Sequence, residues 1–169
     1  DVDQVAKMMV ATKTRNAGML DFDLFRNVVD EAGPGLVRID FFNYGEAFLH
    51  KRAVEMCEYI KTKFPHIYLY TSTNGLAFTE EKVRQLARSG IDEVTFSIDG
   101  SSQEAYVRYR QRGNFDKAIA NLRALVDEKR KAGSAVLVRV RRTLVPAAKG
   151  RPERWDEEEV AVTDQPAVS

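Results

Sequence analysis

Three short polar segments, each placed directly after an apolar run, could bind a small polar molecule. The segments are NYGE at 43–46, TSTNG at 71–75 and SIDGSS at 97–102. Their glycines, Gly45, Gly75 and Gly100, allow the backbone to approach a ligand closely and to adopt positive φ. Glu46 and Asp99 offer carboxylate acceptors, which suit an ammonium group or sugar hydroxyls.

The same segments carry neutral hydrogen-bonding groups in Thr73, Asn74 and Ser97. This set favours binding over nucleophilic catalysis, because neither His50 nor His66 completes a Ser-His-Asp arrangement. Neither phosphate-binding pattern, G-x-G-x-x-G or G-x-x-x-x-G-K, occurs in the chain. The sequence therefore predicts binding residues and indicates no catalytic and no metal-ligating residue.

Each polar segment also has a purely structural interpretation. Glu46 could cap the helix that follows it, since a carboxylate in a first helical turn is stabilising. Asp99 with Gly100 could form only a turn, and so could Thr73 to Gly75. What separates the two interpretations is whether the segments lie together in the fold.

The elements that must position these segments alternate between strand and helix. Apolar periodicity predicts helices over 21–32, 51–64, 79–90 and 114–131, and strands over 36–42, 67–72, 93–98 and 135–144. This is the pattern of an α/β fold in which right-handed crossovers connect about four parallel strands. A doubly wound sheet and part of a (β/α) barrel both satisfy it. In either fold the turns that leave parallel strands share one edge, where ligands bind.

The two ends of the chain lack this alternation. Residues 1–20 are compatible with a helix but poorly amphipathic, and we interpret them as a lead-in to a core at 21–144. Three of the five prolines and the acidic run 156–159 lie in 145–169. We expect those residues to form a disordered or atypical tail, with the acidic run solvated.

Composition excludes several classes of partner. With a net charge of +1, the chain gives no electrostatic reason to expect a nucleic acid or an anionic membrane. No apolar run approaches the roughly 18 residues of a membrane helix. The single cysteine, Cys57, excludes an internal disulfide and any multi-cysteine metal site, so a reducing, cytoplasmic location is expected.

Taken in order, the polar segments resemble the radical S-adenosylmethionine (radical SAM) superfamily, particularly members that modify peptides and carry a C-terminal auxiliary-cluster domain. The family's Gly-Gly-Glu-Pro turn is matched by Tyr44-Gly45-Glu46-Ala47. Its Thr-Asn-Gly turn is matched by 73–75 and its Ser-x-Asp-Gly turn by 97–100. Residues 106–125 resemble the loop and helix that follow, and the likeness covers about 19–144.

This resemblance implies that the chain binds S-adenosylmethionine (SAM). The Gly45-Glu46 turn would hold the ammonium of the methionine moiety, and Tyr44 would face the same site. Ser97 and Asp99 would contact the ribose.

The remaining roles concern the nucleoside and the carboxylate of SAM. Thr73 and Asn74 would shape the nucleoside side of the site. Arg110, or one of the strand arginines Arg139 and Arg141, would pair with the methionine carboxylate.

One departure from the family pattern limits the expected chemistry. The family holds three irons of a [4Fe–4S] cluster with a three-cysteine loop, and SAM binds the fourth iron. Here Cys57 lies on the apolar face of a predicted helix, as a buried core thiol would. We therefore expect the chain to be the middle of a radical SAM core and inactive alone. The first strand and the cysteine loop would lie before Asp1, and the cluster would occur only in the complete parent.

A second class of function stays open. The chain could be a non-redox α/β module that binds a small molecule or nucleotide, or one that serves only a structural role. In the radical SAM interpretation, the complete parent could act on a peptide. In both interpretations, hydrophobic strands at the edges of an incomplete sheet would favour self-association.

Overall fold

The computed structural model describes residues 18–41, 45–100, 102–110, 113–144 and 156–161. Their strands form a single five-stranded sheet in the order β1-β2-β3-β4-β5. The strands are β1 (Arg38–Asp40), β2 (Tyr68–Thr73), β3 (Glu93–Ser97), β4 (Leu137–Leu144) and β5 (Asp156–Ala161). The first four are parallel, and β5 is antiparallel to β4. The predicted α/β class with four parallel strands is confirmed.

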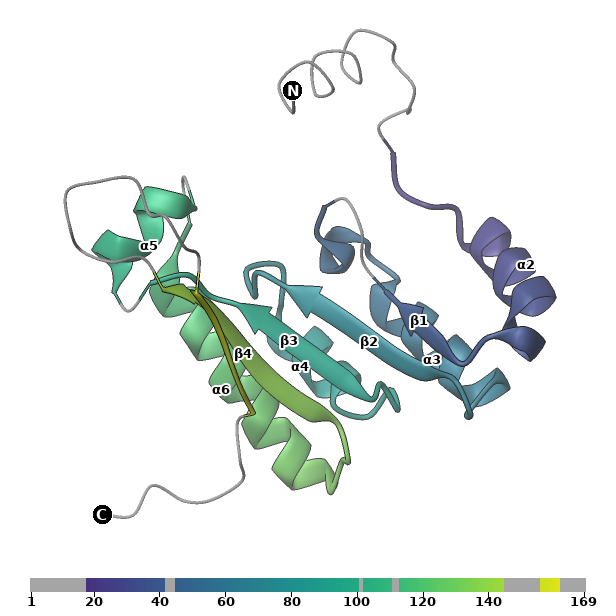
Figure 1. Cartoon of the computed structure of the whole chain (residues 1–169). Coiled ribbons are helices and arrows are strands. Elements are labelled where there is room, and N and C mark those ends of the chain that lie inside the picture. The colour runs from purple at the N-terminus through teal and green to yellow at the C-terminus, as the bar shows by residue number, and fades with distance from the viewer. Residues whose placement is uncertain (1–17, 42–44, 101, 111–112, 145–155, 162–169) are drawn as a thin grey trace, which may run out of the picture.

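Helices connect the parallel strands. They are α2 (Phe22–Ala32), α3 (Ala53–Lys63), α4 (Glu80–Leu86), α5 (Gln103–Tyr109) and α6 (Phe115–Ala132), with 3₁₀ turns η1 (Gly33–Gly35) and η2 (Ala47–Leu49). Figure 1 shows α3, α4 and α6 on the same face of the sheet. A doubly wound sheet reverses its strand order and carries helices on both faces. The described part of this sheet does neither.

Sequence signals set the limits of these helices. The Thr79 hydroxyl accepts a hydrogen bond from the backbone N–H of Lys82, and the Asn114 side chain caps α6 in the same way. Gly133 ends α6 with φ +60°, in the left-handed conformation that glycine adopts without strain. The predicted helix start at Thr79 is confirmed, and the helix predicted over 114–131 is α6.

The core lies between the sheet and the helices. Val94, Phe96 and Val138 point to the helical face and are fully buried. On α3, Ile60 and Cys57 meet this layer without any exposure. Burial raises the pKa of the Cys57 thiol, so Cys57 is the buried core thiol that its position indicated.

Asp92 joins three strands and a helix at the edge where the strands begin. Its backbone N–H donates to the carbonyl of Leu69, and its own carbonyl accepts from the N–H of Leu137. Its carboxylate oxygen Oδ2 accepts from the Leu69 N–H at 2.7 Å and from Lys61 Nζ at 2.8 Å. One residue thereby fixes the register of β2, β3 and β4 and connects α3 to these strands.

The C-terminal segment contains a strand where the structure describes it, although a disordered or atypical tail was expected. Asp156–Ala161, which contain the acidic run, form β5 on the outer side of β4. The register sets Glu159 opposite Arg141 and Glu158 opposite Arg142. The rest of the predicted tail, and residues 1–17 of the predicted lead-in, lie outside the described residues.

Among the described residues, no helix is both long and apolar enough to cross a membrane.

The two glycines of η1 provide a test of core packing. A methyl group added at Gly33 would lie 2.5 Å from the ring of the buried Phe64, whereas one added at Gly35 would meet no atom within 4 Å. We expect Gly33→Ala to lower the free energy of unfolding by about 1–3 kcal/mol through overpacking. Gly35→Ala should leave it unchanged or raise it by about 0.4–1 kcal/mol. Urea denaturation measures both, and equal effects would contradict the packing described here.

Candidate functional site

The turn after β1 begins the candidate site. Gly45 has φ +117°, a conformation that side chains disfavour, and no atom lies within 4 Å of where its Cβ would be. The backbone at Gly45 is therefore exposed on an open side. Tyr44, which was predicted to face this site, lies outside the described residues.

Glu46 links this turn to the end of β2. Its carboxylate oxygen Oε1 accepts a hydrogen bond from the Thr73 hydroxyl at 2.8 Å and a longer one from the Phe48 N–H at 3.3 Å. The other oxygen, Oε2, accepts from the Asn74 N–H at 2.8 Å. The bond to Phe48 caps η2, so the structural role considered for Glu46 is real. The bonds to Thr73 and Asn74 show that the first two polar segments lie together.

The turn after β2 is held mainly by its own side chains. The Thr73 hydroxyl accepts from the Gly75 N–H at 3.0 Å, and the Asn74 Oδ1 accepts from the Leu76 N–H at 2.8 Å. Gly75 has φ +75°, and a Cβ there would lie 2.9 Å from the Phe96 ring. Both side chains that were predicted to bind a ligand therefore also shape their own turn.

The third polar segment adds a neutral pair and an ion pair. The hydroxyls of Ser97 and Ser72 lie 2.9 Å apart and connect the ends of β3 and β2. Asp99 is 8% exposed and accepts from Arg110 Nε at 2.8 Å. Gly100 has φ +80°, so all three predicted turn glycines have positive φ. Hydrogen bonds thus connect three successive strand ends along one edge of the sheet.

Arg139 lies away from this edge. In the register of β3 and β4 it stands opposite Thr95, and its Nε is 3.1 Å from Oε1 of Glu93, the first residue of β3. Arg141 stands opposite Ser97, two residues nearer the strand ends, and donates to the Tyr70 hydroxyl at 3.4 Å. Of the three predicted partners for a ligand carboxylate, the structure joins Arg110 to the polar edge, sets Arg141 opposite Ser97 and places Arg139 near the start of β3.

Sequence reasoning missed one residue of this edge, Asn121, and assigned no role to another, Ser72. The Asn121 side chain reaches from α6 and donates to the carbonyl of Gly75 at 2.7 Å. A single asparagine on an amphipathic helix gives no sequence signal, because polar residues are normal on the exposed face of such a helix. Ser72 lies inside a predicted strand, where its hydroxyl is equally inconspicuous.

The sheet face opposite the helices carries charged and aromatic side chains. The Tyr68 hydroxyl donates to Glu93 Oε2 at 2.5 Å, and Arg38 lies over the rings of Tyr68 and Tyr70. Burial, together with the hydrogen bond to the Glu93 carboxylate, raises the pKa of Tyr68 to about 12. Glu93 is nearly buried, and its carboxylate lies between Tyr68 and Arg139.

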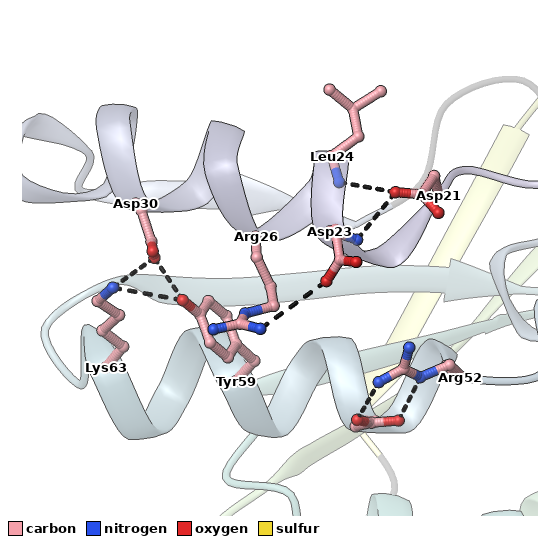
Figure 2. Close-up of polar contacts among 9 residues, drawn as sticks. Asp21, Asp23, Leu24, Arg26, Asp30, Arg52, Tyr59 and Lys63 are labelled. Atoms are coloured by element: carbon pink, nitrogen blue, oxygen red, sulfur yellow. Dashed lines mark hydrogen bonds and ion pairs between the residues drawn. The ribbon is translucent and has the colours of Figure 1, made fainter.

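A groove of about 420 Å³ lies elsewhere, between α2 and α3. It is lined by Phe22, Arg26, Arg52, Glu55, Glu58, Tyr59 and Thr62. Figure 2 shows the polar contacts around it, including Asp30, which pairs with Lys63 and accepts a hydrogen bond from the Tyr59 hydroxyl. Arg52 forms an ion pair with Glu55. Most of these charged groups already pair with one another. The groove is also separate from the strand ends, so we do not assign the site to it.

The groups at the polar edge are suited to binding a polar ligand and not to catalysing a reaction. It presents two carboxylates, an arginine, hydroxyls and open backbone at Gly45. Among the described residues, no three histidine, cysteine or acidic side chains are grouped so that they could hold a metal ion.

Comparisons with known proteins identify relatives over most of the chain. The sequence model of the family described as "Radical SAM superfamily" matches residues 4–140. The tungsten-containing aldehyde ferredoxin oxidoreductase cofactor-modifying protein of Pyrococcus furiosus is 38% identical over 84 residues, which are 48% of this chain and 23% of that protein. Mycofactocin maturase MftC of Mycolicibacterium smegmatis is 29% identical over 100 residues, which are 59% of this chain and 25% of that protein. The chain thus spans about a quarter of the length of these relatives.

A solved structure is similar over a comparable length. The crystal structure of BtrN in complex with AdoMet and 2-DOIA aligns with a TM-score of 0.46 and 24% sequence identity. The alignment covers 61% of this chain and 43% of BtrN.

The hydroxyl of Thr73 is predicted to stabilise the polar edge. Thr73→Val removes one donor from Glu46 and leaves the buried Gly75 N–H without its acceptor, which should cost about 1–3 kcal/mol of unfolding free energy. Thr95→Val is the matched control, since Thr95 is equally buried in the same sheet and makes one long bond of 3.4 Å. Thermal or urea denaturation compares the two. A larger loss for Thr95→Val would contradict the network.

Tyr68 should make the stability of the fold depend on pH in the alkaline range. Its folded-state pKa is raised above the unfolded value of 10, so the unfolded state loses the proton first. The stabilisation is complete below pH 10 and is lost as the pH rises toward about 12. We expect unfolding free energies measured between pH 9 and 12 to fall less steeply for Tyr68→Phe than for the chain without this substitution. Identical slopes would show that Tyr68 titrates normally.

Proposed function

The chain belongs to the radical SAM superfamily, and on this premise we propose that its polar strand-end edge binds the methionine and ribose portions of SAM. One observation carries the proposal. Glu46 bridges the first two strand-end turns, and Oε1 accepts two hydrogen bonds while Oε2 accepts one. A carboxylate has about four acceptor positions, so Oε2 keeps capacity for the ammonium of SAM. The open backbone at Gly45 lets a ligand come close.

The other roles follow from the family motifs. Ser97 and Asp99 are proposed to contact the ribose, and Thr73 and Asn74 to form the nucleoside side of the site. For the methionine carboxylate, Arg110 is favoured over Arg139. Its side chain is 42% exposed and lies beside Asp99, whereas Arg139 lies beside Glu93 near the strand starts.

The residues of this chain do not fit the family's [4Fe–4S] cluster. Three thiolates are needed, and the chain contains one cysteine, Cys57, which is buried in α3. We therefore propose that these 169 residues bind SAM but do not cleave it, and that cluster ligands must come from outside them. No chemical step is assigned to the chain alone.

We also propose assignments for the complete protein. The chain is proposed to be a core segment from a partial (β/α) barrel. The complete parent is proposed to be a cytoplasmic enzyme that modifies peptides and carries an auxiliary-cluster domain. The one-sided helical cover and the unreversed order of the parallel strands support the barrel. The likeness of residues 106–125 to the family's loop and helix supports the assignment as a core segment.

The alternative is a non-redox module in which the same edge serves folding only. One observation favours it, since the Glu46 carboxylate accepts three hydrogen bonds from the protein itself and so has a structural role whether or not it binds a ligand.

Calorimetric titration of the 169-residue chain with SAM separates these functions. We expect Glu46→Gln to weaken SAM binding by about tenfold or more, because a charge-assisted hydrogen bond to the ammonium is lost. Binding of 5′-methylthioadenosine, which has no amino-acid group, should be unchanged in the same variant. Glu55→Gln, on the exposed side of α3, is the control and should bind both ligands normally.

Two outcomes would reject the assignment. If the folded 169-residue chain without substitutions fails to bind SAM, the result would favour the structural module. An equal loss of affinity for both ligands in Glu46→Gln would mean that Glu46 acts through the shape of the turns and not through the ammonium.

A further inference from the structure

Tyr106 carries a buried hydroxyl that the proposed function does not use. The residue is fully buried in α5, which lies at the edge where the parallel strands end (Figure 1). Among the described residues, its hydroxyl has no hydrogen-bond partner. Buried hydroxyls in native proteins are nearly always paired, because an unpaired one has lost its hydrogen bonds to water without replacement. The position of this hydroxyl therefore needs a physical explanation.

Close packing fixes the ring of Tyr106. It lies edge-on to the Phe115 ring, with the two centroids 5.9 Å apart, and a methyl group added at Gly113 would overlap with its Cε1 atom. Rotation of the ring about its own axis leaves the hydroxyl in place, because the oxygen lies on that axis. The hydroxyl can therefore gain a partner within the protein only when a neighbouring group moves.

The charged neighbours of this hydroxyl are Arg110 and Asp99. Arg110 directly follows α5, and its backbone N–H donates to the Tyr106 carbonyl at 2.9 Å. Its side chain pairs with Asp99 at 2.8 Å. Burial raises the pKa of Tyr106, while the charge of Arg110 lowers it and the Asp99 carboxylate raises it. The hydroxyl thus lies within electrostatic range of both members of the ion pair.

The two members of this ion pair differ in exposure. The Arg110 side chain is 42% exposed and that of Asp99 is 12% exposed. The arginine can therefore turn toward a ligand, whereas the aspartate stays inside the protein. If Arg110 pairs with the carboxylate of SAM, the ligand and Asp99 compete for one guanidinium. Losing a donor is unfavourable for a carboxylate with so little access to water, and a replacement donor would offset that loss.

We propose that Tyr106 is a positioning residue that replaces Arg110 as a donor to Asp99 when SAM binds. This inference rests on the proposed SAM site and adds one residue to it. In the free chain, Arg110 donates to Asp99. In the complex, Arg110 turns to the ligand carboxylate and the Tyr106 hydroxyl donates to Asp99. The exchange keeps Asp99 in place for the ribose, and it also pairs the hydroxyl.

Tyr106→Phe tests the exchange by calorimetric titration, because it removes the hydroxyl and keeps the ring. We expect SAM to bind about tenfold or more weakly, since a hydrogen bond to a charged group is missing from the complex. Affinity for 5′-methylthioadenosine, which has no carboxylate and leaves Arg110 on Asp99, should be unchanged. Tyr59→Phe, in the groove between α2 and α3, is the control and should bind both ligands normally.

Two results of the titration would overturn the inference. Unchanged affinity of Tyr106→Phe for SAM would show that Asp99 needs no second donor. An equal loss of affinity for both ligands would show that Tyr106 acts on the nucleoside side and not through the carboxylate of SAM.

Urea denaturation without ligand separates this inference from the SAM assignment. Tyr106→Phe alone should leave the midpoint unchanged or raise it, because the variant no longer buries an unpaired hydroxyl. In Arg110→Met, Tyr106 is expected to donate to Asp99, so adding Tyr106→Phe should lower the midpoint by about 0.5 M. Equal shifts in the two backgrounds would overturn the exchange, even in a chain that binds SAM. If the chain does not bind SAM, the proposed function fails, whereas unequal shifts would still support the exchange of donors at Asp99.

Discussion

The fold depends on one carboxylate at the edge where its strands begin. Asp92 bonds to β2 through its backbone and side chain, to β4 through its carbonyl, and to α3 through Lys61. The Asp92 side chain is 31% exposed and that of Lys61 only 12%, so the pair is less screened by water than an ordinary surface ion pair. These bonds help to set the register of β2 against β3 at the start of the sheet. At the other end of the same two strands, that register leaves the hydroxyls of Ser72 and Ser97 2.9 Å apart.

At the opposite edge, Glu46 also joins neighbouring elements, because it connects the turns that follow β1 and β2. The candidate site therefore has both a structural and a binding role. Its hydrogen bonds hold two turns together, and its carboxylate is also the group best suited to bind a cation there. The two roles are compatible, because a site built from turns must be held rigid before it can select a ligand. The same holds for Asp99, which is nearly buried and paired with Arg110 while it faces the polar edge.

Much of this could be predicted from local sequence. Apolar periodicity located four helices and the four parallel strands, and Thr79, Gly133, Gly45, Gly75 and Gly100 behave as their residue types indicate. What could not be predicted depends on partners far away in the chain. The acidic run at 156–159 has the composition of a solvated segment, and its pairing as a strand with β4 involves residues 12 or more positions away in the chain, which local composition does not reveal. Arg139 and Arg141 are two residues apart in one strand, and only the register with β3 shows which lies nearer the polar edge.

The burial of Cys57 has a practical consequence. A thiol without solvent exposure and with a raised pKa reacts with alkylating reagents only when its surroundings open. Because no second cysteine competes, the alkylation rate of the native chain would report how often α3 separates from the sheet. The same inertness makes the chain a convenient host for an introduced surface cysteine. A spin label or fluorophore placed there would modify one position, and its mobility would report local motion of the fold in solution.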